Sequence, residues 1–448
     1  MTNILTSVIQ TLDQQILNDS SLTADVFEKL IAQQHELGLL HGDRPTCPFL
    51  RPHLISRSKY EEIKSAATII AHAFEKLVDE ALVNPKIMDQ LDLTFAEKEM
   101  ALIDPGYARL CVTSRLDAYL TENDFKFLEY NAESPAGVGD QMQLEKVLFP
   151  LPSTRQFLSE YKHWRPRPHD QLLAALVAAY REWGGTAQSP QIAIVDWRGV
   201  DTASEFRVLQ QYFETEGHLT RIVDPHDLDY ASETLTAGDF RIDILYKRVV
   251  IHEFLNEFDR DHPLIRAYAD GRVCMANSFR SKLAHKKSGF AILSDPAYSA
   301  IFSPQELEII RRHIPWTRKV KPGPTSFEDQ EHELLQLIKT ERERFVLKPN
   351  DDYGGHGVFL GWELDVDQWE DAISAAVERP YVVQERVAVD KITIPMFSDK
   401  VRIEEMFVDF NPFLFQNQVE GALIRLSNSS VLNVTSGGGQ TALVVLED

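Results

Sequence analysis

The chain has 448 residues, of which 44% are hydrophobic, so it is long enough to fill the cores of about two to four compact units. Lys and Arg total 46 against 68 Asp and Glu, and the formal net charge of −22 disfavours nonspecific attraction to nucleic acid or anionic lipid. A polyanionic ligand would therefore have to meet a local basic site or a metal ion.

The sequence also lacks the patterns that predict secretion or membrane insertion. No run of about 18 apolar residues is present, and residues 1–17 have neither the basic start nor the continuous apolar stretch of a signal peptide. The three cysteines, Cys47, Cys111 and Cys274, are far apart and form no Cys-x-x-Cys pair, which suits a reducing compartment. We therefore expect a cytoplasmic globular protein whose partners are neither membranes nor nucleic acid.

Residues 1–100 are predicted to be helical, because apolar positions recur every three or four residues in 26–31 and 66–83. The loop between them, 41–53, contains two histidines and a cysteine, but their spacing matches no standard metal site. A proline-stiffened surface loop is the favoured interpretation. Arg44 and Arg51 in this loop remain candidates for facing a substrate.

From Tyr107 onward the apolar period changes to two, which predicts a β-hairpin of strands 109–120 and 125–131 around a turn at 122–124. Pairing centred on this turn sets Asp117 opposite Glu129 on one face of the hairpin.

The same pairing sets Arg115 opposite Asn131, so that four polar side chains share one face. Two opposed carboxylates repel each other unless a cation lies between them. A Mg²⁺ ion held by Asp117, Glu129 and Asn131 would remove this repulsion, because hard cations prefer carboxylate and amide oxygens. The alternative is a solvated charged face on which Arg115 is the ion-pair partner; the apolar residues of the second strand make it the less favoured one.

An alternating pattern of strands and helices follows a proline-rich stretch at 164–168. Strands at 192–197, 219–223 and 242–246, with a helix at 203–216, predict a small parallel sheet whose ligands lie beyond the carboxyl ends of its strands. The side chains expected at this edge are Trp197, Arg198, Asp201, Ser204 and Glu205. Ordinary loop and helix-capping roles for these residues are an equally open interpretation.

The stretch 345–361 predicts a second hairpin, in which a buried strand ending at Lys348 leads into a glycine-rich loop. Glycines at this density let backbone N–H groups approach an anion, and Lys348 adds a positive charge at the base of the loop. The pattern favours a phosphate-covering loop, although a plain tight turn stays open. The loop residues concerned are Tyr353, Gly354, Gly355, His356 and Gly357. No P-loop or Rossmann glycine motif occurs elsewhere in the chain.

A basic helix at 279–287 precedes this hairpin, and at least one of Lys282, Lys286 and Lys287 is expected to point inward. After the hairpin, a helix at 366–377 leads to a strand at 381–387 and then to a β-rich end at 401–446.

Three of these motifs resemble the ATP-grasp superfamily: Val346–Pro349 as the strand lysine, Asp351–Gly357 as the phosphate loop, and Val382–Glu385 as the adenine hinge. In ordinary members the metal-binding acidic residue and the Glu-x-Asn motif come after the hinge. Here Arg115-x-Asp117 and Glu129-x-Asn131 come long before it. This order is similar to the circularly permuted ATP-grasp enzymes, and specifically to the synthetase half of glutathionylspermidine synthetase.

Some features depart from that pattern. Glu133 and Ser134 stand where the resemblance leads one to expect Asp and Thr, and no cysteine-amidase half is present. The identity of the substrate pair therefore does not carry over from the resemblance.

The resemblance implies an α/β fold of α+β lobes, a circularly permuted ATP-grasp fold. It divides the chain into an N-terminal helical region (1–100), a permuted metal-binding part (101–150), a parallel pre-ATP-grasp-like domain (185–275) and the nucleotide-binding lobes (276–448).

The resemblance also implies a ligase with ATP and Mg²⁺ as cofactors and a small-molecule carboxylate and amine as partners. The carboxylate would attack the γ-phosphate to give an acylphosphate, which the amine would then displace. An ATP-dependent phosphotransferase and a non-catalytic nucleotide-binding regulatory protein are the open alternatives, and a homodimer is left open as well.

Each site residue has an implied role. Asp117, Glu129 and Asn131 would hold the metal, and Arg115 would stabilise the transferring phosphoryl group. Lys348, one of Lys282 and Lys286, and the loop Gly354–Gly357 would bind phosphates, while Gln384 and Glu385 would meet the adenine and ribose. Arg425 and Asn433 would touch phosphate or acyl group, with a structural salt bridge equally open for Arg425.

Overall fold

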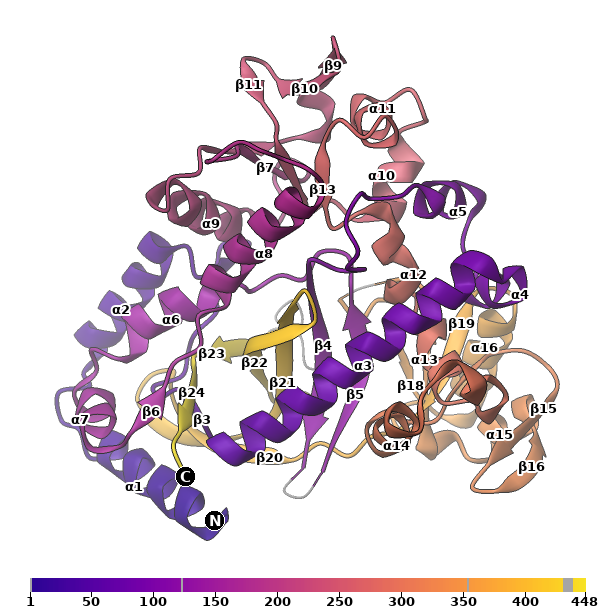
Figure 1. The fold of residues 1–448 in the computed structure, drawn as a ribbon. Helices are drawn as coiled ribbons and strands as arrows, with labels where there is room; N and C mark the ends of the chain where they lie inside the picture. Colours follow the sequence, from indigo (N-terminus) through magenta and orange to yellow (C-terminus); the bar gives the residue numbers. More distant parts are fainter. Residues whose placement is uncertain (1, 122–123, 353, 430–437) are drawn as a thin grey trace.

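The structure is a computed structural model that describes residues 2–121, 124–352, 354–429 and 438–448, with side chains from residue 5 onward. Within these residues no helix has both the length and the apolar character needed to cross a membrane. Three larger sheets organise the chain, and the helices pack on their faces (Figure 1).

The central sheet is built from the predicted first hairpin and the β-rich C-terminal part. Its strand order is β23-β22-β21-β4-β5, with β20 also paired to β21. The strands are β4 (Thr113–Leu120), β5 (Phe125–Asn131), β20 (Lys391–Phe397), β21 (Val401–Phe415), β22 (Gln418–Ser427) and β23 (Gly439–Thr441). Their inward side chains form the largest hydrophobic core of the protein.

The N-terminal part contributes directly to this core. Helix α3 (Arg57–Val83) runs across the central sheet (Figure 1) and buries Ile63, Ile70, Phe74 and Leu77, which recur at helical spacing. The helix therefore forms one wall of the core. Residues 1–100 are mostly helical, as predicted, with the helices α1 (Thr2–Leu17), α2 (Ala24–Leu37), α3, α4 (Pro85–Met88) and α5 (Phe95–Leu102), but three short strands, β1, β2 and β3, lie between α2 and α3.

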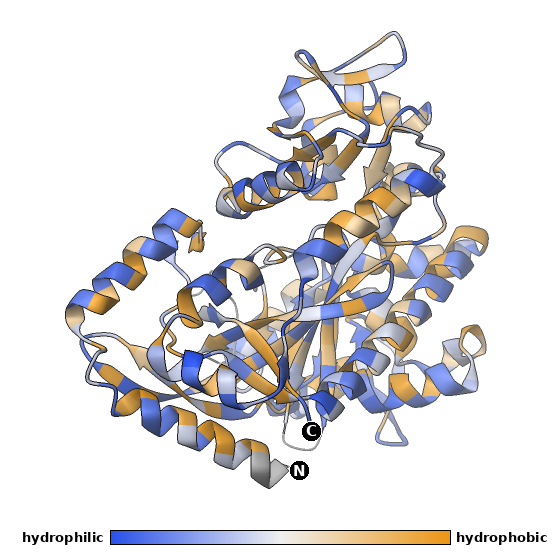
Figure 2. Ribbon diagram, turned by 60° about the vertical axis from the view of Figure 1, so that its left-hand side comes forward, coloured by the Kyte–Doolittle hydropathy of each residue, from blue (hydrophilic) through white to orange (hydrophobic). Residues whose placement is uncertain are grey.

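A three-stranded sheet joins distant parts of the chain. Strand β24 (Leu443–Leu446) pairs in parallel with β3 (His53–Ser56) and in antiparallel fashion with β6 (His163–Trp164). Helices α1 and α2 pack beside this sheet together with α6 (Asp140–Leu148) and α7 (Pro152–Glu160). Figure 2 shows helix α1, next to the N label, with alternating hydrophilic and hydrophobic residues, as expected for a helix with one buried face.

The predicted parallel sheet is confirmed. Its order is β13-β12-β7-β8, and all three pairings are parallel. The strands are β7 (Ile192–Val195), β8 (Thr220–Val223), β12 (Ile244–Lys247) and β13 (Cys274–Ala276), and the neighbouring helices are α8 (Pro168–Glu182), α9 (Ala203–Thr215), α10 (Ile251–Glu257) and α11 (Pro263–Ala269). A small antiparallel sheet of β9 (Leu228–Ala231), β10 (Thr234–Ala237) and β11 (Phe240–Arg241) continues the same unit.

The last of the three larger sheets contains the predicted glycine-rich hairpin, and its strand order is β14-β19-β17-β18. Its strands are β14 (Thr317–Lys319), β17 (Phe345–Pro349), β18 (Phe359–Leu360) and β19 (Tyr381–Glu385). Helices α15 (Leu334–Thr340) and α16 (Val366–Val377) pack against it around the buried Trp369. The connection from the parallel sheet to this sheet runs through α12 (Lys282–His285), α13 (Ser288–Leu293) and α14 (Pro304–His313).

Two short hairpins complete the fold: β1 (Leu40–His41) with β2 (Arg44–Pro45), and β15 (Pro324–Phe327) with β16 (Gln330–Glu333).

Candidate active site

A cavity of about 1120 Å³ lies between the three larger sheets, and it is lined by residues of the central sheet, of the sheet with the glycine-rich hairpin, and of the segments that follow the strands of the parallel sheet. Its volume is in the range of pockets that bury small organic ligands. It brings together most of the residues that the sequence singles out: Arg115, Asp117, Glu129, Asn131, Lys348, Gly354, Gly355, His356, Gln384, Glu385 and Arg425. The early hairpin and the glycine-rich hairpin therefore face one common cavity. Tyr353 and Asn433 lie outside the described residues.

The predicted hairpin register is confirmed, because Asp117 pairs with Glu129 and Arg115 pairs with Asn131. The ladder is not continuous, however. A β-bulge follows Asp117, so that Ala118 pairs with Phe127 and Leu128 is left between two pairs. The carbonyl of Leu128 accepts a hydrogen bond of 3.4 Å from Lys348 Nζ, which joins the bulge to the glycine-rich hairpin.

Asp117 is held between two guanidinium groups. Arg115 donates to both of its oxygens, with Nε–Oδ1 at 2.7 Å and Nη2–Oδ2 at 3.1 Å, and Arg425 Nη2 donates to Oδ2 at 2.8 Å. Burial alone would raise the pKa of Asp117, but the two arginines hold it at about 2. The carboxylate therefore stays ionised at every pH at which the protein would be assayed.

Arg425 has a second anionic partner. Its guanidinium contacts Asp409, with Nη2–Oδ2 at 2.6 Å, and the Asp409 side chain is buried. Arg425 thus forms the structural salt bridge that was one of its two predicted roles, and it also lines the cavity.

Glu129 forms an ion pair with Lys287, whose Nζ lies 2.8 Å from Glu129 Oε1. Burial opposes the charge on Glu129, yet Lys287 and Lys348 lower its pKa below the usual value despite the nearby Asp117. Asn131 lines the cavity on the same strand. Two ionised carboxylates and an amide on adjacent strands form a donor set of the kind that Mg²⁺ accepts.

Lys348 occupies the base of the glycine-rich loop. Its Nζ donates to Gln384 Oε1 at 2.7 Å, and burial lowers its pKa to about 8 despite the nearby Glu129. Gly354, Gly355 and Gly357 have φ values of +68°, +79° and +66°, a conformation that other residues rarely adopt. A Cβ on Gly357 would also lie 2.8 Å from Tyr381 Oη. The glycines are therefore required by the path of the loop itself.

Of the three lysines in the basic segment, Lys287 is the one that lines the cavity. Lys282 and Lys286 instead bind the two oxygens of Asp351, each at 2.6 Å, and their side chains are buried. Their ammonium groups are balanced by a carboxylate cluster of Asp351, Glu97 and Glu133. The geometry thus gives no support to a phosphate contact by Lys282 or Lys286 and favours Lys287. The sequence offered no signal for this choice, because α12 ends at His285 and the two following lysines lie in a turn.

Glu133, His285 and Asp351 lie close enough to one another to hold a metal ion. Lys282 Nζ, however, lies 2.7 Å from Glu133 Oε1 and 2.6 Å from Asp351 Oδ1. An ammonium group therefore already supplies the positive charge at this position, and Asp117, Glu129 and Asn131 remain the better donor set for a metal.

The edge of the parallel sheet forms the other end of the cavity. Of the five side chains predicted there, Trp197, Asp201 and Glu205 line the cavity. Arg198 instead contacts Asp227 and is largely exposed, and Ser204 is buried against Arg207. Glu205 Oε1 accepts the backbone N–H groups of residues 137, 138 and 139 at 2.9, 2.8 and 3.4 Å, so it fixes the loop that follows β5.

The same end contains residues that sequence reasoning did not select: His41, Asp140, Asp196, Arg248, Glu253 and Gln440. Asp196 and Arg248 directly follow β7 and β12, so the rule that selected Trp197 could have found them as well. Asp140 and Gln440 gave no such signal, because only tertiary packing brings α6 and β23 together.

The two arginines of the loop at 41–53 have partners within the protein. Arg51 is buried and its Nε lies 2.5 Å from Asp13 Oδ1, while Arg44 Nη2 donates to the carbonyl of Gly438 at 2.9 Å. The expectation that these arginines could face a substrate is thus not supported for Arg51. His41 lines the cavity instead.

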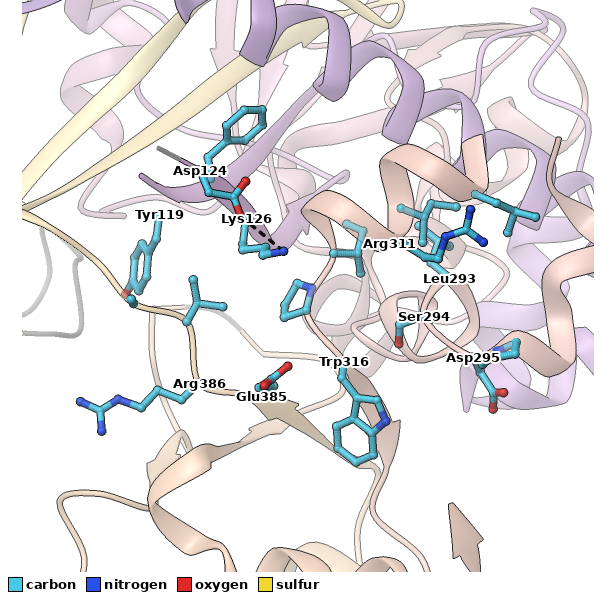
Figure 3. A pocket seen from close by; sticks show the side chains of 18 of the residues that line it. Tyr119, Asp124, Lys126, Leu293, Ser294, Asp295, Arg311, Trp316, Glu385 and Arg386 are labelled. Carbon is cyan, nitrogen blue, oxygen red and sulfur yellow. Dashed lines mark ion pairs between the residues drawn. The ribbon is translucent and has the colours of Figure 1, made fainter. Parts of the chain in front are cut away.

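A second cavity, of about 860 Å³, is lined in part by residues 385–388, of which Figure 3 labels Glu385 and Arg386. It shares Tyr119 and this segment with the first cavity and has an apolar wall that includes Leu293 and Trp316. Its charged groups are mixed in sign, and Lys126 pairs with Asp124 at 3.6 Å. The opposed carboxylates and the glycine-rich loop lie in the first cavity, which is therefore the candidate active site.

No protein-family model matches the sequence, and no curated protein matches it. Among solved structures, the chain is similar to a glutathione synthetase-like effector from Globodera pallida in its apo form. The TM-score is 0.57 at 13% sequence identity, and the match covers 94% of this chain and 96% of that one. A candidate gamma-glutamylcysteine synthetase from Methylobacillus flagellatus matches with a TM-score of 0.42 and 12% identity over 85% of each chain. The likeness to the effector, at a TM-score of 0.57, shows that the chain shares the mixed α/β fold of a glutathione synthetase-like protein.

Proposed function

We propose that the protein is an ATP- and Mg²⁺-dependent carboxylate–amine ligase that forms an amide through an acylphosphate. In this proposal the fold is a circularly permuted ATP-grasp fold like that of the synthetase half of glutathionylspermidine synthetase, and the protein acts on small molecules in the cytoplasm. One observation carries it: Arg115, Asp117, Glu129 and Asn131 share a cavity with Lys348 and the glycine-rich loop. The likeness to a glutathione synthetase-like fold supports it.

The residues present fit the proposed ligands. Lys348, Lys287 and the backbone of Gly354 and Gly355 offer positive charge and N–H groups to phosphate oxygens, as polyanion binding requires in a protein of net charge −22. Asp117, Glu129 and Asn131 would hold Mg²⁺, which when bound would neutralise charge on the phosphate oxygens. Gln384 and Glu385 end the strand that pairs with the strand of Lys348, and in this proposal they would meet the adenine and ribose.

Phosphoryl transfer needs alignment and charge neutralisation rather than covalent help from the protein. We assign the neutralisation of the transferring group to Arg115, because its Nη1 is fixed by the carbonyl of Ala136 at 2.8 Å and its other nitrogens by Asp117. A guanidinium held at both ends is oriented before the substrate arrives, which is the condition for electrostatic stabilisation of a transition state.

The reaction can be tested with a mixture of candidate acids, so that neither substrate has to be identified beforehand. The protein is incubated with ATP, Mg²⁺, hydroxylamine and a mixture of the twenty amino acids, glutathione and γ-glutamylcysteine. Hydroxylamine converts an acylphosphate into a stable hydroxamate, and the mass of that product identifies the acid. A stable phosphorylated product without hydroxamate would indicate a phosphotransferase, and ATP binding without any product would indicate a regulatory protein. Either result would overturn the ligase proposal.

The low pKa of Lys348 predicts a pH dependence of nucleotide binding. Because this pKa is lowered to about 8, the ammonium form that attracts phosphate is lost as the pH rises through about 8. We expect the affinity for ATP, measured by calorimetry from pH 7 to 9.5, to fall across this range. In Lys348→Arg, whose guanidinium remains charged, the affinity should stay nearly constant. An equal decline in both proteins would mean that another group titrates.

A further inference from the structure

Asp140 is a cavity residue that the proposed roles leave unused. It is the first residue of α6, and its Oδ2 accepts a hydrogen bond of 2.7 Å from Gln440 Nε2. Among the described residues, its Oδ1 has no hydrogen-bond partner. One oxygen of this carboxylate is thus fixed, and the other is left available at the cavity wall.

Two independent connections link Asp140 to the cluster of Arg115, Asp117 and Arg425. Along the chain, it lies one turn after Ala136, whose carbonyl accepts a hydrogen bond from Arg115. Across the central sheet, its partner Gln440 is directly opposite Arg425, which binds Asp117. Side chains directly opposite each other in an antiparallel pair lie about 5 Å apart at their Cβ atoms. Asp140 therefore lines the same cavity as the Arg115–Asp117–Arg425 cluster and is linked to it through Gln440.

The charged groups that face Asp140 are Glu205 from α9 and Arg248 from the segment after β12. Glu205 is not free to accept a proton from a ligand through Oε1, because that oxygen binds three backbone N–H groups. Burial and the like charge of Glu205 raise the pKa of Asp140 to about 7. A carboxylate in this range can accept a proton at neutral pH and release it again.

We propose that Asp140 is the general base that deprotonates the amine substrate before it attacks the acylphosphate. This proposal rests on the proposed ligase function. The amine arrives as an ammonium ion and transfers one proton to Asp140 Oδ1. Its nitrogen lone pair then forms the C–N bond at the acyl carbon, and the C–O bond to phosphate breaks with its electron pair leaving on phosphate. The second nitrogen proton passes to the departing phosphate, so that the products are a neutral amide and hydrogen phosphate.

The test separates amide formation from acylphosphate formation. Hydroxylamine is largely unprotonated at neutral pH and needs no base, whereas a polyamine such as spermidine is protonated. Wild type and Asp140→Asn are assayed with ATP, Mg²⁺ and the acid mixture described above. One set receives hydroxylamine, and the other receives an equimolar mixture of glycine, putrescine and spermidine. Asp140→Asn should form hydroxamate within about threefold of the wild-type rate and lose at least about 100-fold in amide formation.

The pH profile provides a second measurement. The wild-type rate of amide formation should rise with pH through about 7, and this limb should be absent in Asp140→Asn but present in Asp140→Glu. Glu145→Gln is the matched control, because Glu145 is on the same helix, pairs with Gln141 and Arg165, and does not line the cavity. It should behave as wild type in both assays.

The outcomes that overturn the proposal are distinct. Wild-type amide formation by Asp140→Asn, or an equal loss of hydroxamate and amide, would show that Asp140 is not the base. If Asp140→Asn does not fold, a pH limb missing from Asp140→Glu would lead to the same conclusion. Absence of hydroxamate from the wild type itself would overturn the ligase function, and with it the role of Asp140.

Discussion

Replacement of Arg115 with alanine is expected to lower the rate of acid-dependent phosphate release by about 10²–10³-fold, the usual cost of removing one preorganised donor from a transition state. The affinity for ATP should change little, because Arg115 is bound to Asp117 and Ala136 in the free protein and is assigned only to the transferring group. Steady-state rates and calorimetric binding of ATP, measured on the same preparation, check both parts.

Arg109→Ala is a suitable control for this variant. Arg109 lies just before β4, the strand that contains Arg115, but it pairs with Glu75 at 3.0 Å and does not line the cavity. Its loss should leave turnover unchanged. If Arg115→Ala turned over at the wild-type rate, or if it lost ATP binding and turnover in equal measure, the role given to Arg115 would be wrong.

Replacement of Arg425 with methionine is expected to give the largest loss of stability. Arg425 is the shared partner of Asp117 and the buried Asp409, so its removal leaves two carboxylates with too little compensation. Breaking a buried pair in this way costs about 3–5 kcal/mol of unfolding free energy. Urea unfolding followed by circular dichroism would show the loss as a lower midpoint.

Two further variants make that result specific. Arg402→Met removes an exposed cation that pairs with Asp399 on the surface, and such pairs contribute about 0–1 kcal/mol. The double variant Arg425→Met with Asp409→Asn should regain part of the lost stability, because it also removes the uncompensated buried charge. If Arg425→Met were as stable as wild type, water or another cation would already compensate the charge of Asp409.

Local sequence patterns were sufficient to predict the strands and loops that carry the site residues. The register that opposes Asp117 to Glu129 follows from strand periodicity and turn position, although the bulge at Leu128 could not be read from the sequence. The parallel sheet was equally accessible, because βα units follow a fixed handedness and their ligands lie at one edge.

Contacts between segments that are distant in sequence could not be predicted from local patterns. The choice among Lys282, Lys286 and Lys287 depends on where Asp351 lies, and a segment 65 residues away along the chain from Lys286 decides it. Helix α3 gave a clear helical pattern, but nothing in that pattern indicated that it would cover the central sheet. Residues that come into contact only in the tertiary fold produce no periodic pattern in the sequence of either segment. The sequence alone therefore does not predict their contact.

The pairing of β3 with β24 has a consequence for how the chain folds. Residues 53–56 pair with residues 443–446, so nearly the whole length of the described chain lies between the two strands. Among the described residues, His53–Ser56 has no other strand partner, and β22 and β23, which belong to the sheet under α3, are also far from the N-terminal helices in sequence. Because contacts between residues far apart in sequence form slowly, we expect the N-terminal helices to dock late in folding.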